Sequence, residues 1–238
     1  MKKFLSIALA LICLLCFVGC KDKTDKTPES SNSQTDSTTI KKESKGLDIQ
    51  PHQDGGYAVV GIGECTDTDI VIPQTYNNGK VLYIIRSAFK NCDNITNITV
   101  PDEFKWIGDA AFEGCTSLVS IKLPTTFTDF CTRSVFSQCT SLTEVVFPEN
   151  TKLINDFAFE NCTSLKSITF PTSVTQICNT AFSGATALKD VYYKGTKEQW
   201  KNIDIFCDNF PSYELTWNFT VHCTDGDLTY GGQDVGWQ

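Results

Sequence analysis

Apolar residues recur along the middle of the chain with a period of 23 or 24 residues. A phenylalanine recurs at the same place in each period, with spacings of 23, 24, 23 and 23 residues: Phe89, Phe112, Phe136, Phe159 and Phe182. Three residues further on a cysteine recurs, at Cys92, Cys115, Cys139 and Cys162, and Ala185 takes that place in the fifth period. A fixed period of this length predicts a solenoid, because each unit has too little core to fold alone and must stack on a similar neighbour.

Each period also contains a short alternating segment, such as SIKLP at residues 120–124. Alternation of apolar and polar residues predicts a strand with one buried face. Proline follows this segment in four periods and ends the strand, because proline cannot donate to a ladder of backbone hydrogen bonds. We therefore expect about five units with short parallel strands on one face and with the Phe and Cys columns in the core. The single 24-residue spacing places its extra residue in a turn, between Pro124 and Phe136.

The segment IGDAAFEGCTSLVSIKLP, residues 107–124, resembles the BspA-type leucine-rich repeat of bacterial surface proteins. The resemblance covers residues 81–194 and implies an α/β-type repeat solenoid. It also implies a surface lipoprotein that adheres to other molecules or contacts host proteins, although a fold does not fix a function.

The flanks of the repeats resemble the caps of the same family. Residues 47–80 resemble a β-rich N-terminal cap, in which Asn78-Gly79 favours a hairpin. Residues 195–238 resemble a helix-plus-strand C-terminal cap that ends in a frayed tail. Within this cap, Thr196 and Gln199 have the spacing of a capping box, which predicts a short helix.

The N-terminus has the features of an export signal. Residues 1–19 contain two lysines followed by an apolar run that is short for a membrane span. The sequence CFVGC, residues 16–20, resembles a bacterial lipobox, which implies that Cys20 is lipidated and anchors the chain to a membrane. An ordinary cleaved signal peptide is the alternative. Residues 20–46 are polar and lack aromatic residues, so we expect a disordered tether.

The charge of the remaining chain excludes one class of partner. Residues 47–238 contain 12 Lys and Arg against 23 Asp and Glu, a net charge of −11. Nucleic acid would be repelled by this charge, and no basic stripe offsets it. The sequence also lacks a nucleophile–base pair, a metal-ligand cluster and a cofactor loop, so we predict no catalytic residue, metal or cofactor.

The cysteine column could hold metal, form disulfides or consist of free thiols. Zinc ligands usually come in close pairs from tight turns, whereas these cysteines come one per period. We interpret them as buried free thiols in the place of a small apolar residue. A disulfide between Cys207 and Cys223 stays open. His222 precedes Cys223 on a predicted strand, so the two side chains point to opposite faces, which argues against a Cys/His dyad.

The outward positions of the predicted strands form the candidate binding strip. It comprises two columns: Asn97, Ser120, Glu144, Ser167 and Asp190, and Thr99, Lys122, Val146, Thr169 and Tyr192. Solenoids often bind their partners on such extended surfaces. The sequence therefore predicts a non-enzymatic, lipid-anchored and surface-exposed protein of the cell envelope that binds an extracellular or host protein, or a glycan.

Two alternatives to this function stay open. The first is a structural envelope protein that binds a partner of the same cell. The second and weaker one is a glycan-acting enzyme with Glu144 and Asp190 as paired carboxylates, because their two-repeat separation of roughly 10 Å approaches that of inverting glycosidases.

Overall fold

The computed structural model describes residues 42–125, 132–206 and 217–230. All the described residues belong to one compact unit. The predicted signal peptide, the lipidation site Cys20 and most of the predicted tether lie outside the described residues. In the described part of the chain, no helix is long and apolar enough to cross a bilayer.

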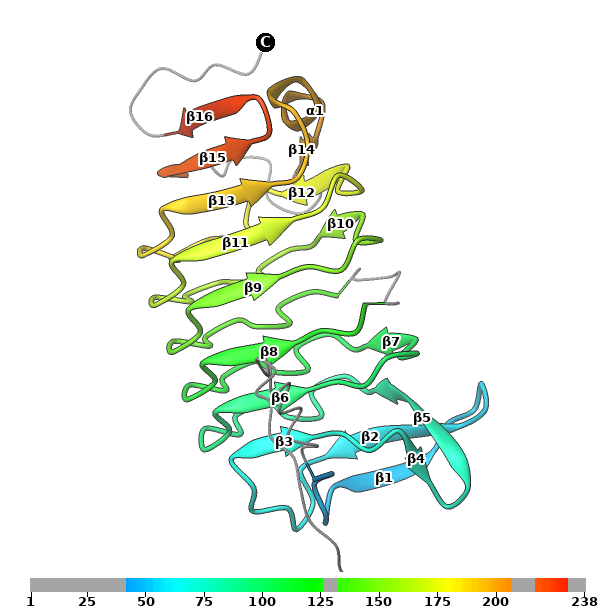
Figure 1. Ribbon diagram of the computed structural model, residues 1–238. Helices are drawn as coiled ribbons and strands as arrows, with labels where there is room; N and C mark the ends of the chain where they lie inside the picture. Colours follow the sequence, from blue (N-terminus) through cyan, green and yellow to red (C-terminus); the bar gives the residue numbers. More distant parts are fainter. Residues whose placement is uncertain (1–41, 126–131, 207–216, 231–238) are drawn as a thin grey trace, which may run out of the picture. The chain divides into compact units, whose positions relative to one another are not determined.

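One side of the repeat stack is a row of parallel strands, one from each unit (Figure 1). The row starts with a sheet of three strands: β3 (Asp69–Val71), β6 (Asn97–Thr99) and β8 (Ser120–Lys122). It continues in a second sheet with β9 (Glu144–Val146), β11 (Ser167–Phe170), β13 (Asp190–Tyr193) and β15 (Phe219–Cys223). Equivalent residues face each other, as Ile98 faces Ile121 and Ile168 faces Val191. Because β3 belongs to the row, the row begins inside the region predicted to be the N-terminal cap.

A second row is formed by shorter strands. Along the chain, each of them follows a strand of the first row. It comprises β7 (Trp106–Ile107), β10 (Leu153–Ile154), β12 (Gln176–Cys178) and β14 (Asp204–Phe206). The last three form one parallel sheet, and β7 pairs with β5 (Gly79–Ile84). Ile107, Ile154 and Ile177 are fully buried in this row. Phe130 and Cys131, which stand near the equivalent place in the third repeat, lie outside the described residues.

The turns that carry the phenylalanines are not helical, so the predicted repeat solenoid consists mostly of strands and has few helices. The residue two positions after each phenylalanine has a positive φ of 56–72°: Asn91, Gly114, Gln138, Asn161 and Gly184. Such left-handed residues interrupt a helix. The turns are joined instead by backbone hydrogen bonds between units, as from Phe89 N–H to the Ala111 carbonyl at 2.9 Å and from Phe112 N–H to the Val135 carbonyl at 3.0 Å. The described residues are therefore mostly strand and turn, with one short helix.

The five phenylalanines form a continuous stack through the core. Successive ring centroids are 5.6, 5.6, 5.5 and 5.8 Å apart from Phe89 to Phe182, with nearly parallel planes. Phe89, Phe112, Phe136 and Phe159 have no solvent-exposed surface. Burial of this many aromatic rings supplies much of the hydrophobic stabilisation of the stack.

The cysteine column lies beside the phenylalanine stack. Cys115, Cys139 and Cys162 are free and fully buried, and Cys92 at the start of the column is half-buried. Each of the three buried thiols donates to the carbonyl of a phenylalanine in the preceding unit, for example Cys115 Sγ to the Phe89 oxygen at 3.1 Å. Burial raises the pKa of Cys115 and of Cys162 to about 12. These thiols therefore stay protonated and behave as small core residues.

The N-terminal end is closed by antiparallel strands. β1 (Asp48–Pro51) pairs with β2 (Tyr57–Gly61), and β4 (Thr75–Tyr76) pairs with β5. The predicted hairpin exists, but its two turn residues are Asn77 and Asn78, both at positive φ, and Gly79 already pairs with Tyr76. A two-residue turn of this kind needs positive φ at both positions, and Asn adopts it readily.

Part of the predicted tether is ordered against this cap. Ser44 is buried, its N–H donates to the Val71 carbonyl at 2.9 Å, and its hydroxyl oxygen accepts from the Val71 N–H at 3.0 Å. Ser44 therefore extends the edge of β3, and the polar sequence around it is held by backbone bonding rather than by apolar burial.

The C-terminal end confirms the predicted capping box. Helix α1 (Lys197–Lys201) begins after Thr196, whose side chain accepts from Gln199 N–H, while the Gln199 side chain accepts from Thr196 N–H. Trp200 on this helix is buried, and its ring stacks on Phe170 at 6.3 Å.

The prediction of a frayed tail after the final strand is wrong for residues 226–230. They form β16 (Gly226–Tyr230), antiparallel to β15. Tyr230 is buried, and its hydroxyl accepts a hydrogen bond from Trp200 Nε1 at 2.8 Å. The strand is held because its last side chain completes the aromatic cap, which the polar sequence before it does not reveal. Residues 231–238 lie outside the described residues.

Candidate binding surface

The outward side chains of the strand row form two columns, and the structure places all ten predicted strip residues in them. The register aligns Asn97 with Ser120, Glu144 with Ser167, and Ser167 with Asp190. The columns also extend beyond the predicted strip, because β3 and β15 belong to the row. The residues added at the two ends are Asp69, Val71, Thr220 and His222.

Two apolar side chains on this surface are unusually exposed. Val146 is 57% exposed and Tyr192 is 46% exposed, and both belong to the second column, with Thr169 between them. Ser120, Lys122 and Glu144 are exposed as well, whereas the other predicted strip residues are half-buried. Exposed aromatic and aliphatic groups among polar neighbours are the side chains from which interface hot spots are built.

A polar and aromatic cluster lies at the C-terminal end of the strip. The His222 ring stacks on Tyr192, with the two centroids 4.9 Å apart. His222 Nε2 lies 2.9 Å from Asp190 Oδ1, and His222 Nδ1 lies 3.1 Å from Asp227 Oδ1. Hydrogen bonding to Asp190, assisted by Asp227, raises the pKa of His222, against the smaller opposing effect of burial. The two hydrogen bonds and the ring stacking therefore hold His222 in a fixed position beside Tyr192.

Sequence reasoning missed this cluster, because it compared His222 only with its neighbour Cys223. The signal was present in the alternation of FTVHC, residues 219–223. Alignment of Val221 with the inward column, as the structure has it against Val191, places His222 next to Tyr192 on the outward side. Asp227 was harder to place, because its position depends on the hairpin between β15 and β16.

The two carboxylates of the glycosidase alternative both lie on this surface. Glu144 and Asp190 lie in one column with Ser167 between them, but Asp190 is hydrogen-bonded to His222. Within the described ranges, no group of three or more His, Cys, Asp or Glu side chains is arranged to hold a metal ion. Cys223 is free in the structure. Cys207 lies outside the described residues, so a disulfide between the two stays open.

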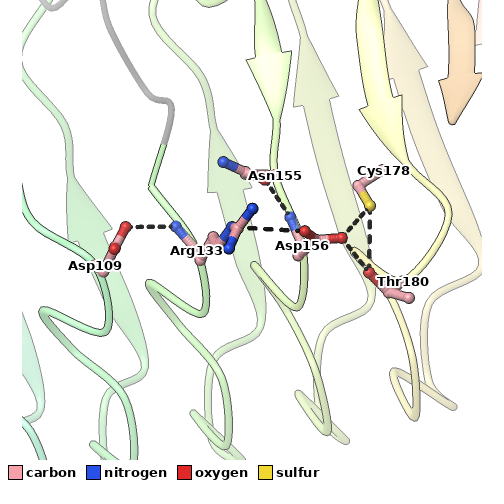
Figure 2. Close-up of polar contacts among 6 residues, drawn as sticks. All are labelled: Asp109, Arg133, Asn155, Asp156, Cys178 and Thr180. Carbon is pink, nitrogen blue, oxygen red and sulfur yellow. Dashed lines mark hydrogen bonds and ion pairs between the residues drawn. The ribbon is translucent and has the colours of Figure 1, made fainter. Parts of the chain in front are cut away.

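A second polar cluster is buried near the turns (Figure 2). Asp156, which is 3% exposed, accepts from the Thr180 hydroxyl at 3.0 Å and from the Cys178 thiol, and the Arg133 guanidinium lies 3.6 Å from its other oxygen. Burial, together with the hydrogen bond to Asp156, raises the pKa of Cys178 to about 11. The thiol is therefore unreactive at neutral pH, and the cluster joins adjacent units rather than forming an active site.

The stacked strands, the inter-unit turns and the aromatic core together define a leucine-rich repeat solenoid. The chain belongs to the family of the BspA-type leucine-rich repeat region, whose model matches residues 64–209 with six copies. The match starts before and ends after the five units that the phenylalanine spacing gives. Proteins of this family are repeat proteins that generally bind other proteins and lack catalysis.

Solved structures support the same assignment. A leucine-rich cell surface protein of Faecalibacterium prausnitzii A2-165 is 32% identical, with a TM-score of 0.62 over 69% of this chain and 43% of that one. A leucine-rich repeat protein of T. pallidum is 28% identical, with a TM-score of 0.57 over 63% of this chain and 71% of that one. The chain thus spans less than half the length of the F. prausnitzii protein. No curated protein matches it.

Proposed function

We propose that this chain is a non-enzymatic adhesive protein of the bacterial cell surface, and that its strand row binds an extracellular or host protein. The observation that carries the proposal is the exposure of Val146 and Tyr192 on a rigid, regularly spaced sheet. Rigid scaffolds that present apolar anchors among polar groups bind with little loss of conformational entropy.

The polar part of the surface supports a protein partner. Glu144, Asp190 and Asp227 give the surface acidic groups, and Lys122 adds one basic group. The Tyr192–His222 stack offers a flat aromatic platform beside two carboxylates. This mixture fits a polar protein surface, where charges set the orientation and aromatic contacts supply the affinity.

The location is part of the same proposal. Lipidation of Cys20 would anchor the chain, and residues 21–41 would separate the repeats from the membrane. The similarity to the F. prausnitzii protein, which is a cell surface protein, supports this placement. Replacement of Cys20 by Ala should release the chain from the membrane fraction. Retention of the variant in that fraction would contradict lipid anchoring.

A binding screen tests the function. The purified chain, with its cysteines reduced, is measured against a panel of extracellular matrix proteins and glycans. Any saturable binding is then measured again with Lys122, Val146 and Tyr192 all changed to Ala. The matched control changes Lys80, Val119 and Tyr76 to Ala, since these are exposed residues of the same types outside the strip.

The outcomes separate the candidate functions. Binding that the strip variant loses and the control variant keeps, at unchanged melting temperature, supports the adhesive function. Binding that survives in the strip variant places the contact elsewhere. If the whole panel fails while the chain captures a defined envelope component of its own cell through the same strip, the structural envelope role replaces the proposal.

A further inference from the structure

The strand row is interrupted at one place, between β8 and β9. No ladder register joins these two strands, although they belong to consecutive units. Their units remain joined before the strands begin, where Thr143 N–H donates to the Val119 carbonyl at 3.3 Å. After the strands, Val100 N–H bonds to Lys122 and Phe147 N–H bonds to Thr169 in the neighbouring units. Between the described residues of β8 and β9, Leu123 N–H forms no equivalent bond.

A hollow of about 390 Å³ lies where the two units part. Its walls are apolar and include Ile121, Leu123, Val146, Phe147 and Pro148. Ile121 is only half-buried, whereas Ile98, Val145, Ile168 and Val191 at the same place in other units are at most 2% exposed. The volume is near the lower limit of ligand pockets, which is roughly 300 Å³, so the hollow suits a single side chain and its backbone rather than a large cofactor.

The polar groups around the hollow indicate what would complement it. Leu123 offers a backbone N–H that takes part in no strand ladder. The exposed Lys122 amine makes no ion pair with any described residue. Glu149, on the rim, is already paired with Lys194. A complementary ligand would therefore offer a carbonyl oxygen to Leu123 N–H, a carboxylate to the Lys122 amine and an apolar group to the hollow.

We propose that the cleft between β8 and β9 binds an extended peptide segment of the partner protein, with a bulky apolar side chain in the hollow and a neighbouring Asp or Glu on Lys122. A peptide carbonyl accepts from Leu123 N–H, as in the recognition of peptides by open strand edges. This assignment rests on the proposed protein-binding function and specifies the chemistry of the partner.

A library of random linear twelve-residue peptides, displayed on phage, is a suitable probe. It is selected on the purified chain and counter-selected on the Val146→Lys variant, in which a charged side chain enters the mouth of the hollow. Val146 is exposed, so this variant should fold, and an unchanged melting temperature checks it. Val119→Lys is the matched control, because Val119 is exposed and does not line the hollow.

The expected result is a set of peptides with a bulky apolar residue next to Asp or Glu. Val146→Lys should weaken their binding about tenfold or more, since one apolar group in a pocket contributes roughly 10- to 200-fold. Val119→Lys should leave it unchanged. On the Lys122→Glu variant, selection should favour Lys or Arg beside the apolar residue.

Two outcomes would overturn the inference. One is that no peptide prefers the original chain over Val146→Lys, and the other is that the selected peptides keep their affinity for that variant. The proposed function fails separately. A matrix protein whose binding depends on Tyr192 but is unaffected by Val146→Lys would keep the adhesive strip and remove the cleft. If no matrix protein or glycan in the panel binds, the adhesive function is contradicted, whether or not peptides bind to the cleft.

Discussion

In the first four repeats the turn that carries the phenylalanine is built from the same contacts, whereas the outward strand positions differ from one repeat to the next. The turns repeat a left-handed residue, a stacked ring and an inter-unit backbone bond. Along one outward column of the strand row the residues are Thr99, Lys122, Val146, Thr169 and Tyr192. The phenylalanine turns, here called the turn side, therefore fix the spacing of the units. The outward strand positions, here called the strand side, can differ between units and can present different functional groups at that spacing.

The largest effect is expected when one phenylalanine ring is removed from the stack in the turns. Phe112→Ala should lower the free energy of unfolding by about 3–5 kcal/mol, because the ring is fully buried between Phe89 and Phe136 and its loss leaves a cavity. Urea denaturation followed by circular dichroism measures the loss. Tyr192→Ala on the strand side is the control and should change stability much less. Equal losses for the two variants would contradict the division of roles.

The second prediction concerns Asp156, and it asks whether buried polar contacts near the turns also stabilise the stack of units. Asp156→Ala should cost about 1–3 kcal/mol, because the Thr180 hydroxyl and the Cys178 thiol lose their common acceptor in a buried place. Thermal melting measures the change. The double variant Asp156→Ala/Thr180→Val should recover part of the loss, since one unpaired donor is removed with its acceptor. No recovery would mean that Asp156 acts through other contacts.

The repeats and the main strand row could be predicted from sequence, because stacking forces the same side-chain types into columns such as Phe112 and Phe136. The candidate strip followed from simple alternation along each strand. The turn conformation did not follow, since Asn91, Gly114 and Gln138 share a left-handed backbone without sharing a side-chain type.

Features that depend on contacts between distant segments could not be predicted from periodicity. Asp227 reaches His222 only through the final hairpin, and Tyr230 reaches Trp200 across the cap. The cleft between β8 and β9 depends on the loss of a ladder, whereas the sequence shows only an extra residue in the following turn. Such features need the register of neighbouring units, which the period alone does not determine.

The third prediction concerns the C-terminal cap, and it asks whether contacts beyond the repeats contribute to the stability of the core. Tyr230→Phe removes the acceptor of the Trp200 Nε1 hydrogen bond in a buried place and should lower stability by about 1 kcal/mol. Chemical denaturation monitored by tryptophan fluorescence measures this change. Tyr192→Phe on the exposed strip is the matched control and should stay within about 0.5 kcal/mol. Identical behaviour of the two variants would show that β16 contributes little to the cap.

The smallest expected effect is a pH dependence of stability at the C-terminal end of the strip, where the polar side chains of the strands also stabilise the fold. His222 is hydrogen-bonded to Asp190 on β13 and to Asp227 on β16, and it stacks on Tyr192. The hydrogen bond to Asp190 is the main cause that raises the pKa of His222 above its ordinary value of about 6.5. Folding therefore favours the protonated ring, and the stability that this gives is complete below about pH 6.5 and is lost as pH rises through the higher pKa of the folded state.

Melting temperatures of the original chain and of His222→Gln, compared across this range, isolate the contribution. The difference between the two proteins should be largest below the ordinary histidine pKa and should shrink as the pH rises. His52→Gln is the control, because His52 stacks on Tyr83 at the opposite cap and is not held between two carboxylates. A constant difference at all pH values would mean that His222 stabilises the end of the row through stacking on Tyr192 alone. In that case packing would stabilise the strand side as it stabilises the turn side. The charged groups around His222 would then contribute to the binding of a partner and not to stability.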